Sequence, residues 1–224
     1  MELQAPRGLN LFFPKTIIRI ISFPNDTDSE RQCYELEIDG KNVLYDIYTN
    51  IRENSSAKLV YEIWRRPNLH KFVLFIDVKV DMNSGELYVL SRKINRNNKP
   101  VDVNPMIIGI YLKKFLTHIH ALGLTHGDFT DTNILWNGGN PYVIDFERSV
   151  DQIDFPDDFL YFKMIDYADL VITLNKLNQK FYRDASQIAQ KIKEYEDDIM
   201  NDELDTDKKS ILEKLNNDMM EKLN

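Results

Sequence analysis

The chain has 224 residues, of which 43% are apolar and 29% are charged. These values are typical of one folded domain, or of two small lobes, and exclude collagen-like, coiled-coil and fully disordered chains. The 36 acidic and 28 basic residues give a net charge of −8 at pH 7. This balance argues against broad electrostatic binding to nucleic acid or to an anionic membrane. We therefore expect no direct nucleic-acid binding.

The sequence also indicates the compartment. Its longest uncharged, apolar-rich run, residues 106–112, is far too short to span a bilayer. The N-terminal residues lack the apolar stretch of a signal peptide. The single cysteine, Cys33, excludes an internal disulfide framework and a cysteine-based zinc site. We expect a cytoplasmic protein that does not bind membranes.

The first ninety or so residues are predicted to form strands and one helix. Strands are predicted over 16–23, 33–40 and 41–49, and the Asp39-Gly40 pair predicts a tight hairpin between the last two. Residues 55–66 have helical apolar spacing, with Ser55 or Ser56 as the N-cap and Pro67 as the stop. Two further strands are predicted over 71–80 and 85–94. The order is three strands, one helix and two strands.

A polar stretch over 95–104 predicts a linker between an N-terminal lobe (1–95) and a helical C-terminal lobe (96–224). Asn104 and Pro105 begin a helix that ends before Gly123, and residues 157–177 form a second helix that is apolar around most of its circumference. Two amphipathic helices follow, one reaching Ile199 and the other carrying the apolar residues from 212 to 223. The fold class predicted is α+β.

The C-terminal helices are acidic. Residues 184–224 hold 12 Asp and Glu against 6 Lys, which accounts for −6 of the net charge of −8. Two interpretations stay open: a solvated face of terminal helices, and a docking surface for a partner protein.

The segment 123–149 is the part of the chain with recognisable chemistry. It is predicted to form a loop, a strand to Trp136, a turn, and a second strand that ends at Asp145. This arrangement places Asp128, Asn133 and Asp145 at one end of a hairpin. Carboxylate and carboxamide oxygens are the ligands that Mg²⁺ takes, and a carboxylate not fully engaged by metal can accept a proton from a hydroxyl.

The pattern His126-Gly127-Asp128, then Asn133, then Asp145-Phe146 resembles the catalytic loop (124–133) and the metal motif (145–147) of the protein-kinase-like superfamily. The resemblance covers most of residues 15–177. It implies a bilobal fold with a small antiparallel β-rich N-lobe and a mainly helical C-lobe. It also implies that ATP and Mg²⁺ or Mn²⁺ are cofactors and that Asp128 is the catalytic base. Asn133 and Asp145 would bind the nucleotide through its metal ion, as ligands of that ion.

The segment HGDFTDTN is similar to the loop of the compact atypical kinases of the KEOPS complex and of RIO-like kinases. HGDF, NILW and IDFE also resemble aminoglycoside, choline and lipopolysaccharide sugar kinases. Only about ten residues separate Asp145 from the next predicted helix, which leaves little room for a long activation segment. We therefore expect a kinase that transfers the γ-phosphoryl group of ATP to a Ser or Thr hydroxyl of a protein, with a small-molecule kinase as the alternative.

The N-terminal lobe departs from the family pattern. The hairpin region 22–32 contains no glycine, and Asp46 aligns with the lysine that binds the α- and β-phosphates. Glu62, in the predicted helix, is placed where the family has the glutamate that pairs with this lysine. The candidate substitutes for the missing lysine are Lys41, Lys58 and Lys79, and for each of them an ordinary surface role is the other interpretation. The departures from the family pattern favour a pseudokinase that acts as an interaction module.

Overall fold

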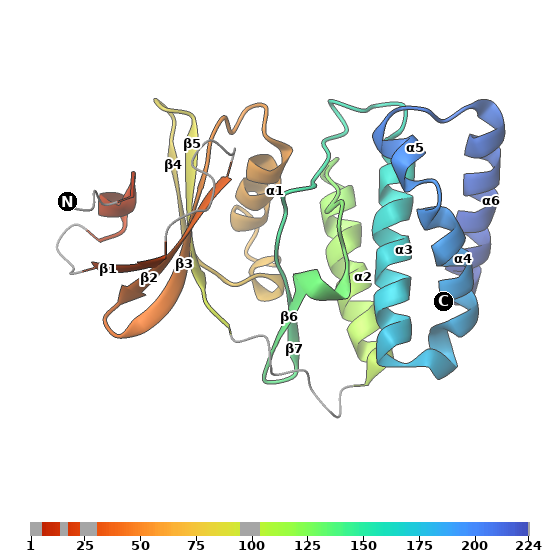
Figure 1. Ribbon diagram of the computed structural model, residues 1–224, viewed down its shortest axis with the longest axis horizontal. Coiled ribbons are helices and arrows are strands. Elements are labelled where there is room, and N and C mark those ends of the chain that lie inside the picture. Colours follow the sequence, from red (N-terminus) through yellow and green to blue (C-terminus); the bar gives the residue numbers. More distant parts are fainter. Residues whose placement is uncertain (1–5, 14–17, 23–30, 95–103, 224) are drawn as a thin grey trace. The chain divides into compact units, whose positions relative to one another are not determined.

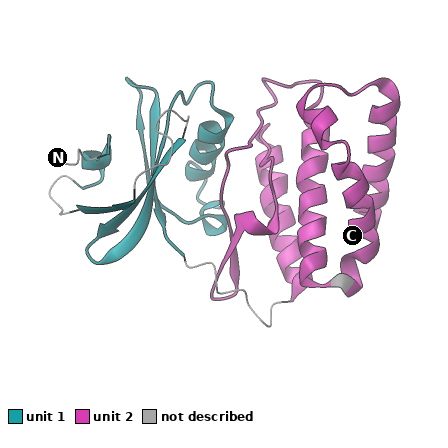
Figure 2. Cartoon of the chain, viewed as in Figure 1, with its two compact units in different colours: residues 1–95 teal, residues 96–224 magenta. Residues whose placement is uncertain are grey.

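The computed structural model describes residues 6–13, 18–22, 31–94 and 104–223. The chain divides into two compact units, residues 1–95 and 96–224 (Figure 2). One unit is built on an antiparallel sheet and the other is mainly helical, which confirms the predicted α+β fold class. In the described part of the chain, no helix combines the length and the apolar character needed to cross a membrane.

The first unit contains a five-stranded antiparallel sheet in the order β1-β2-β3-β5-β4 (Figure 1). Its elements are β1 (Ile18–Ser22), β2 (Arg31–Ile38), β3 (Lys41–Tyr48), α1 (Ser55–Trp64), β4 (Phe75–Asp81) and β5 (Glu86–Arg92), with short 3-10 turns at Leu9–Leu11 and His70–Phe72. The order of three strands, one helix and two strands is the order predicted from the sequence.

The predicted hairpin between β2 and β3 is present. Asp39 and Gly40 both have positive φ, 50° and 72°, so the two-residue turn has the backbone twist that matches its strands. Ile38 pairs with Lys41 across the turn and Arg31 pairs with Tyr48 at the far end. Side chains from one face of this sheet form a core with Leu9: Leu36, Ile38, Val43, Tyr45, Ile47, Tyr88 and Leu90.

Two boundary predictions in this unit were wrong, and two predicted segments lie outside the described residues. Helix α1 is capped by Asn54, not by Ser55 or Ser56, because the Asn54 side chain accepts the Ala57 N–H at 3.0 Å. The predicted strand 71–80 begins only at Phe75, because His70–Phe72 forms a 3-10 turn that buries Phe72. The linker over 95–103 and most of the glycine-free hairpin region, 23–30, lie outside the described residues.

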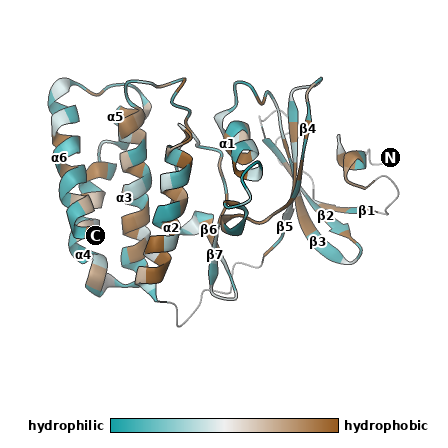
Figure 3. Ribbon diagram, turned by 180° about the vertical axis from the view of Figure 1, so that it is seen from behind, coloured by the Kyte–Doolittle hydropathy of each residue, from teal (hydrophilic) through white to brown (hydrophobic). Residues whose placement is uncertain are grey.

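The second unit is built around α3, which contacts the other four helices of the unit. Its elements are α2 (Pro105–His120), β6 (Ile134–Asn137), β7 (Asn140–Val143), α3 (Phe159–Leu177), α4 (Gln179–Lys193), α5 (Glu196–Met200) and α6 (Thr206–Leu223), with a 3-10 turn at Asp131–Asn133. Asn104 caps α2 by accepting the Met106 N–H at 2.9 Å, and Pro105 is the first helical residue, as predicted. Figure 3 shows that α6 is largely hydrophilic on the face in view, while α3 carries more hydrophobic residues.

The structure corrects three predictions in this unit. The second strand of the hairpin ends at Val143, not at Asp145. The helix that the sequence predicts to be apolar around most of its circumference is not buried all round, because Leu160 of α3 is 43% exposed. The helix predicted to reach Ile199 is divided into α4 and α5, because the Tyr195 N–H bonds to the carbonyl of Ile192 instead of continuing the α-helical ladder.

The C-terminal helices complete the core of this unit. Ala185, Ala189, Ile192, Ile199, Leu212 and Met219 pack with α3 side chains in one cluster. Leu212 has no exposed surface, whereas its neighbour Ile211 is 46% exposed. The two residues therefore form a matched pair on α6.

We predict that Leu212→Ala lowers the free energy of unfolding by about 2–5 kcal/mol, because it removes buried methyl groups and leaves a cavity. Ile211→Ala should change it by less than about 0.5 kcal/mol, as expected at an exposed site. Urea unfolding followed by circular dichroism measures both. Equal effects of the two substitutions would contradict the packing of α6 on α3.

Candidate active site

The predicted site residues of the second unit lie at one end of the β6–β7 hairpin. Ile134 pairs with Val143, and the Ile144 N–H bonds to the Asn133 carbonyl at 3.0 Å, which extends the pairing by one step. Asn133 therefore ends the loop that leads into β6, and Asp145 comes two residues after β7. Asp128 lies in the same loop, five residues before Asn133.

The structure brings Asp128 and Asn133 into direct contact. The Asn133 carboxamide nitrogen donates to the Asp128 carboxylate at 2.8 Å and to the Asp128 carbonyl at 3.0 Å. Asn133 is buried, while Asp128 is half-buried. Both amide hydrogens of Asn133 are thus used within the loop, which leaves its Oδ1 as the atom that can bind a cation.

Asp145 has an unusual backbone conformation. Its φ is +62°, in the left-handed region that Asp and Asn adopt more readily than other non-glycine residues. This conformation turns the chain immediately after β7, and the next side chain, Phe146, is buried. Strained backbone of this kind is concentrated at functional sites.

His126 connects the loop to the segment around Asp145. Its Nε2 lies 3.0 Å from the Ile144 carbonyl, and its Nδ1 accepts the Asp128 N–H at 3.3 Å. Because Nδ1 is an acceptor, the imidazole is neutral and carries its hydrogen on Nε2. The ring is enclosed by Phe129 and Phe146, at centroid distances of 5.3 and 5.2 Å.

Burial lowers the pKa of His126 below its ordinary value, although the charges of Asp166, Asp128 and Asp145 act in the opposite direction. The burial effect is the largest, so the neutral form required by the two hydrogen bonds is favoured. His126 is therefore a structural member of the loop, and its ring does not face an incoming substrate.

Asp166 of α3 binds the loop from the side of the helical core. Its Oδ2 accepts the His126 N–H at 2.8 Å and contacts His120 Nε2 at 2.8 Å, while its Oδ1 accepts the Gly127 N–H at 2.8 Å. The side chain has no exposed surface. Sequence reasoning missed Asp166, and it assigned no partner to His120, because Asp166 is about forty residues from the loop in sequence.

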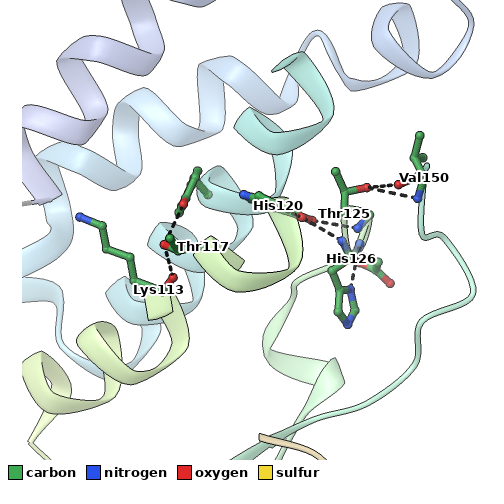
Figure 4. A network of polar contacts seen from close by, with 10 residues as sticks. Lys113, Thr117, His120, Thr125, His126 and Val150 are labelled. Atoms are coloured by element: carbon green, nitrogen blue, oxygen red, sulfur yellow. Dashed lines mark hydrogen bonds and ion pairs between the residues drawn. The ribbon is translucent and has the colours of Figure 1, made fainter. Parts of the chain in front are cut away.

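Gly127 cannot be replaced by a larger residue without moving the chain. Its φ is +80°, and a Cβ built on it would overlap the carbonyl oxygen of Arg148. The loop and the segment after the metal motif therefore pass in backbone contact. On the same side, the Thr125 N–H bonds to the Val150 carbonyl at 3.0 Å, and the Val150 N–H bonds to the Thr125 hydroxyl at 3.2 Å (Figure 4).

The donor set suits a magnesium–nucleotide complex. Asp128 and Asp145 supply carboxylates, and Asn133 supplies a carboxamide oxygen, which are hard oxygen ligands. The described residues contain no cluster of three or more His, Cys, Asp and Glu that would bind a metal by itself.

The predicted cofactor residue Glu62 belongs to the first unit, where it pairs with Arg65 at 3.5 Å and with Arg66. Asp46, which aligns with the family's lysine, is buried and pairs with Arg31 of β2 at 3.0 Å. Lys79 contacts Asp77 at 2.9 Å, and Lys41 is exposed at the start of β3. Asp46 is thus paired with an arginine from the neighbouring strand.

Comparisons with known proteins agree with this geometry. The family model described as "APH: Phosphotransferase enzyme family" matches residues 111–152, which contain the catalytic loop and the metal motif. The match covers about a fifth of the chain, and this segment is therefore similar to a phosphotransferase family. No curated protein matches the sequence.

Among solved structures, the chain is similar to the kinase PK-1 of the Cydia pomonella granulovirus. The identity is 11%, the TM-score is 0.44, and the alignment covers 71% of this chain and 69% of the viral protein.

We predict that Gly127→Ala lowers the free energy of unfolding by about 2–4 kcal/mol, because it adds left-handed backbone strain and an overlap with Arg148. Gly138→Ala is the matched control: Gly138 also has positive φ, 57°, but has no atom within 4 Å of the added Cβ. The control should lose only the strain energy, about 1 kcal/mol. Denaturant unfolding of the two variants measures the difference, and equal losses would contradict the close passage at Arg148.

Proposed function

We propose that this protein transfers the γ-phosphoryl group of ATP to a Ser or Thr hydroxyl of a protein, in a reaction that requires Mg²⁺ or Mn²⁺. The observation that carries the proposal is the gathering of Asp128, Asn133 and Asp145 at one end of the β6–β7 hairpin. The hydrogen bonds of Asp166 and His126 support it, because they fix the loop before any substrate binds.

Each residue has a separate role in the proposed reaction. Asp128 lies at the loop surface, half-buried, and accepts the proton of the attacking hydroxyl. The hydrogen bond from Asn133 orients the Asp128 carboxylate. Asn133 Oδ1 and the carboxylate of Asp145 would hold the cation, which would supply positive charge that offsets the negative charge of the transferred phosphoryl group.

The short segment after the metal motif supports an atypical kinase. Thirteen residues, 146–158, separate Asp145 from the first residue of α3. Much of this segment is committed to contacts with the catalytic loop, as the pairing of Thr125 with Val150 and of Leu124 with Asp151 shows. Little of it is left to form the extended peptide platform of conventional protein kinases.

A small-molecule hydroxyl is the second candidate acceptor. The observation that favours it is the match of residues 111–152 to a phosphotransferase family model, since the chain's motifs also resemble aminoglycoside and choline kinases. A radiolabelled assay that offers casein and myelin basic protein in one series, and kanamycin and choline in another, distinguishes the two acceptor classes.

We predict that Asp145→Asn abolishes the rise in melting temperature that ATP produces with Mg²⁺, because a ligand stabilises a protein only when it binds the native state. Asn tolerates the same left-handed backbone, so the melting temperature without ligand should be retained. Asp128→Asn should keep the nucleotide-dependent shift but lower phosphoryl transfer by about 10²- to 10⁴-fold, the range for loss of a general base.

Asp131→Asn is the matched control for both variants. Asp131 lies in the same loop but pairs with Lys176 at the surface, at 2.5 Å, so its loss should leave binding and transfer near the wild-type values. A rate of phosphoryl transfer by Asp128→Asn equal to that of the wild type would contradict the role of Asp128 as the general base. The absence of any nucleotide shift in the wild-type protein would favour a pseudokinase, in agreement with the Asp46–Arg31 and Glu62–Arg66 pairs.

A further inference from the structure

Asp46 lies in an unusual place for a carboxylate. It is buried in the middle of β3, opposite Cys33 of β2 and Val89 of β5. Its neighbours Tyr45 and Ile47 belong to the core on one face of the sheet, so the Asp46 side chain lies on the other face. A buried carboxylate is costly unless a cation and hydrogen bonds compensate for the lost hydration.

Arg31 of β2 provides this compensation. Its Nε donates to Asp46 Oδ1 at 3.0 Å, and its guanidinium lies over the ring of Tyr48, 5.7 Å from the ring centroid. Arg31 pairs directly with Tyr48 across the two strands, and Asp46 is its diagonal neighbour on the same face of the sheet. The carboxylate and the aromatic ring together orient the guanidinium.

The cation is the accessible member of this pair. The side chain of Arg31 is 20% exposed, whereas that of Asp46 is 7% exposed. A guanidinium carries several N–H donors in a planar fork, and the bond to Asp46 is made by Nε. The same fork matches the oxygen atoms of a phosphate group. An anion in solution can therefore reach Arg31, while Asp46 stays covered.

Other charged residues of this unit are less well placed for such a contact. Two of the three lysines that the sequence suggested as substitutes, Lys41 and Lys79, lie on the opposite face of the sheet. Lys41 pairs with Ile38 and Lys79 pairs with Tyr88, and both partners belong to the core on that face. Glu62, which would hold a lysine of β3, pairs instead with two arginines at the end of its own helix.

We propose that Arg31 binds the phosphate groups of the nucleotide, in place of a lysine on β3. This inference rests on the proposed function, because phosphoryl transfer requires a bound nucleoside triphosphate. The triphosphate carries several negative charges, and the guanidinium would offset part of them through charge-assisted hydrogen bonds. The ion pair is thus inverted relative to the family pattern, since the cation comes from β2 and the carboxylate from β3.

The test compares Asp46→Asn with the double variant Arg31→Gln/Asp46→Asn. Both proteins lack the carboxylate, so they differ only in the guanidinium, and neither has a buried carboxylate without its cation. Isothermal titration calorimetry of the full chain uses Mg²⁺ and a non-hydrolysable ATP analogue. The dissociation constant of the double variant should be about tenfold higher or more, because charge-assisted hydrogen bonds to phosphate are lost. Equal dissociation constants for the two variants would overturn the proposal.

Arg19→Gln is the matched control. Arg19 belongs to β1 of the same unit, its side chain is 78% exposed, and it pairs with Glu37 at 3.7 Å. The substitution removes the same charge from the surface and should leave the dissociation constant within about twofold of the wild-type value. A loss as large as that caused by removal of Arg31 would indicate general electrostatic attraction and would overturn the assignment to Arg31.

The Arg31 Nε–H group gives a local readout in nitrogen-correlated NMR spectra. Its hydrogen bond to Asp46 slows exchange with solvent, and the loss of the signal in Arg31→Gln/Asp46→Asn assigns it. Saturation of the wild-type protein with Mg²⁺ and the ATP analogue should shift this signal. An unchanged signal at saturation would overturn the contact.

The outcome is separable from that of the proposed function. If the wild type binds the nucleotide, Asp145→Asn does not, and removal of Arg31 has no effect, the phosphotransfer site stands and only the role of Arg31 is wrong. Absence of nucleotide binding by the wild type would contradict both.

Discussion

The carboxylate of Asp166 is the contact on which the candidate active site depends. The loop from 121 to 133 has little regular structure, so its buried backbone N–H groups need acceptors from outside the loop. Asp166 accepts two of them, from His126 and Gly127, and also contacts His120, all at 2.8 Å. Because α3 is packed among the other helices of its unit, the Asp166 carboxylate has a fixed position. Its hydrogen bonds therefore fix the backbone of the residues that precede Asp128. The side chain of His126 then connects the loop to Ile144, and so to the backbone that turns at Asp145.

A second set of charges fixes the segment after the metal motif. Arg148, whose carbonyl oxygen lies against Gly127, pairs with Glu196 of α5 at 3.3 Å, and Glu196 also pairs with Lys193 at 2.6 Å. Lys193 in turn contacts the buried Asp169 of α3 at 3.0 Å. Burial raises the pKa of Asp169 to about 6 although Lys193 opposes the shift, whereas the charges of Asp169 and Glu196 raise the pKa of Lys193. The ionised pair is favoured, because the Lys193 ammonium lies within hydrogen-bonding distance of both carboxylates. Glu196, one of the acidic residues at the C-terminal end of the chain, is therefore paired with basic residues of its own unit.

Local signals in the sequence were sufficient for much of the fold. Asp39-Gly40 has the positive φ angles that a two-residue hairpin needs, and Asn104 with Pro105 is a strong helix start, so both were predicted from neighbouring residues alone. The spacing of Asp128, Asn133 and Asp145 predicted a hairpin that brings them together.

Asp166 could not be found in this way, because a single carboxylate on an apolar helix is equally compatible with a solvent-facing position, and its partners lie about forty residues away. The cap of α1 was missed for a different reason: Asn54, Ser55 and Ser56 can all cap a helix, and only the backbone dihedrals select Asn54.

The most direct test of the account is to locate the bound cation. Titration of the isotope-labelled protein with Mn²⁺ and a non-hydrolysable ATP analogue should broaden the amide signals of residues 127–133 and 144–147, because Mn²⁺ held by Asn133 and Asp145 would lie close to those amides. Broadening confined to the two loop segments, and lost in Asp145→Asn, is the predicted result. No localised broadening, or broadening that persists in the variant, would contradict the assignment of Asp128, Asn133 and Asp145 as one phosphotransfer site.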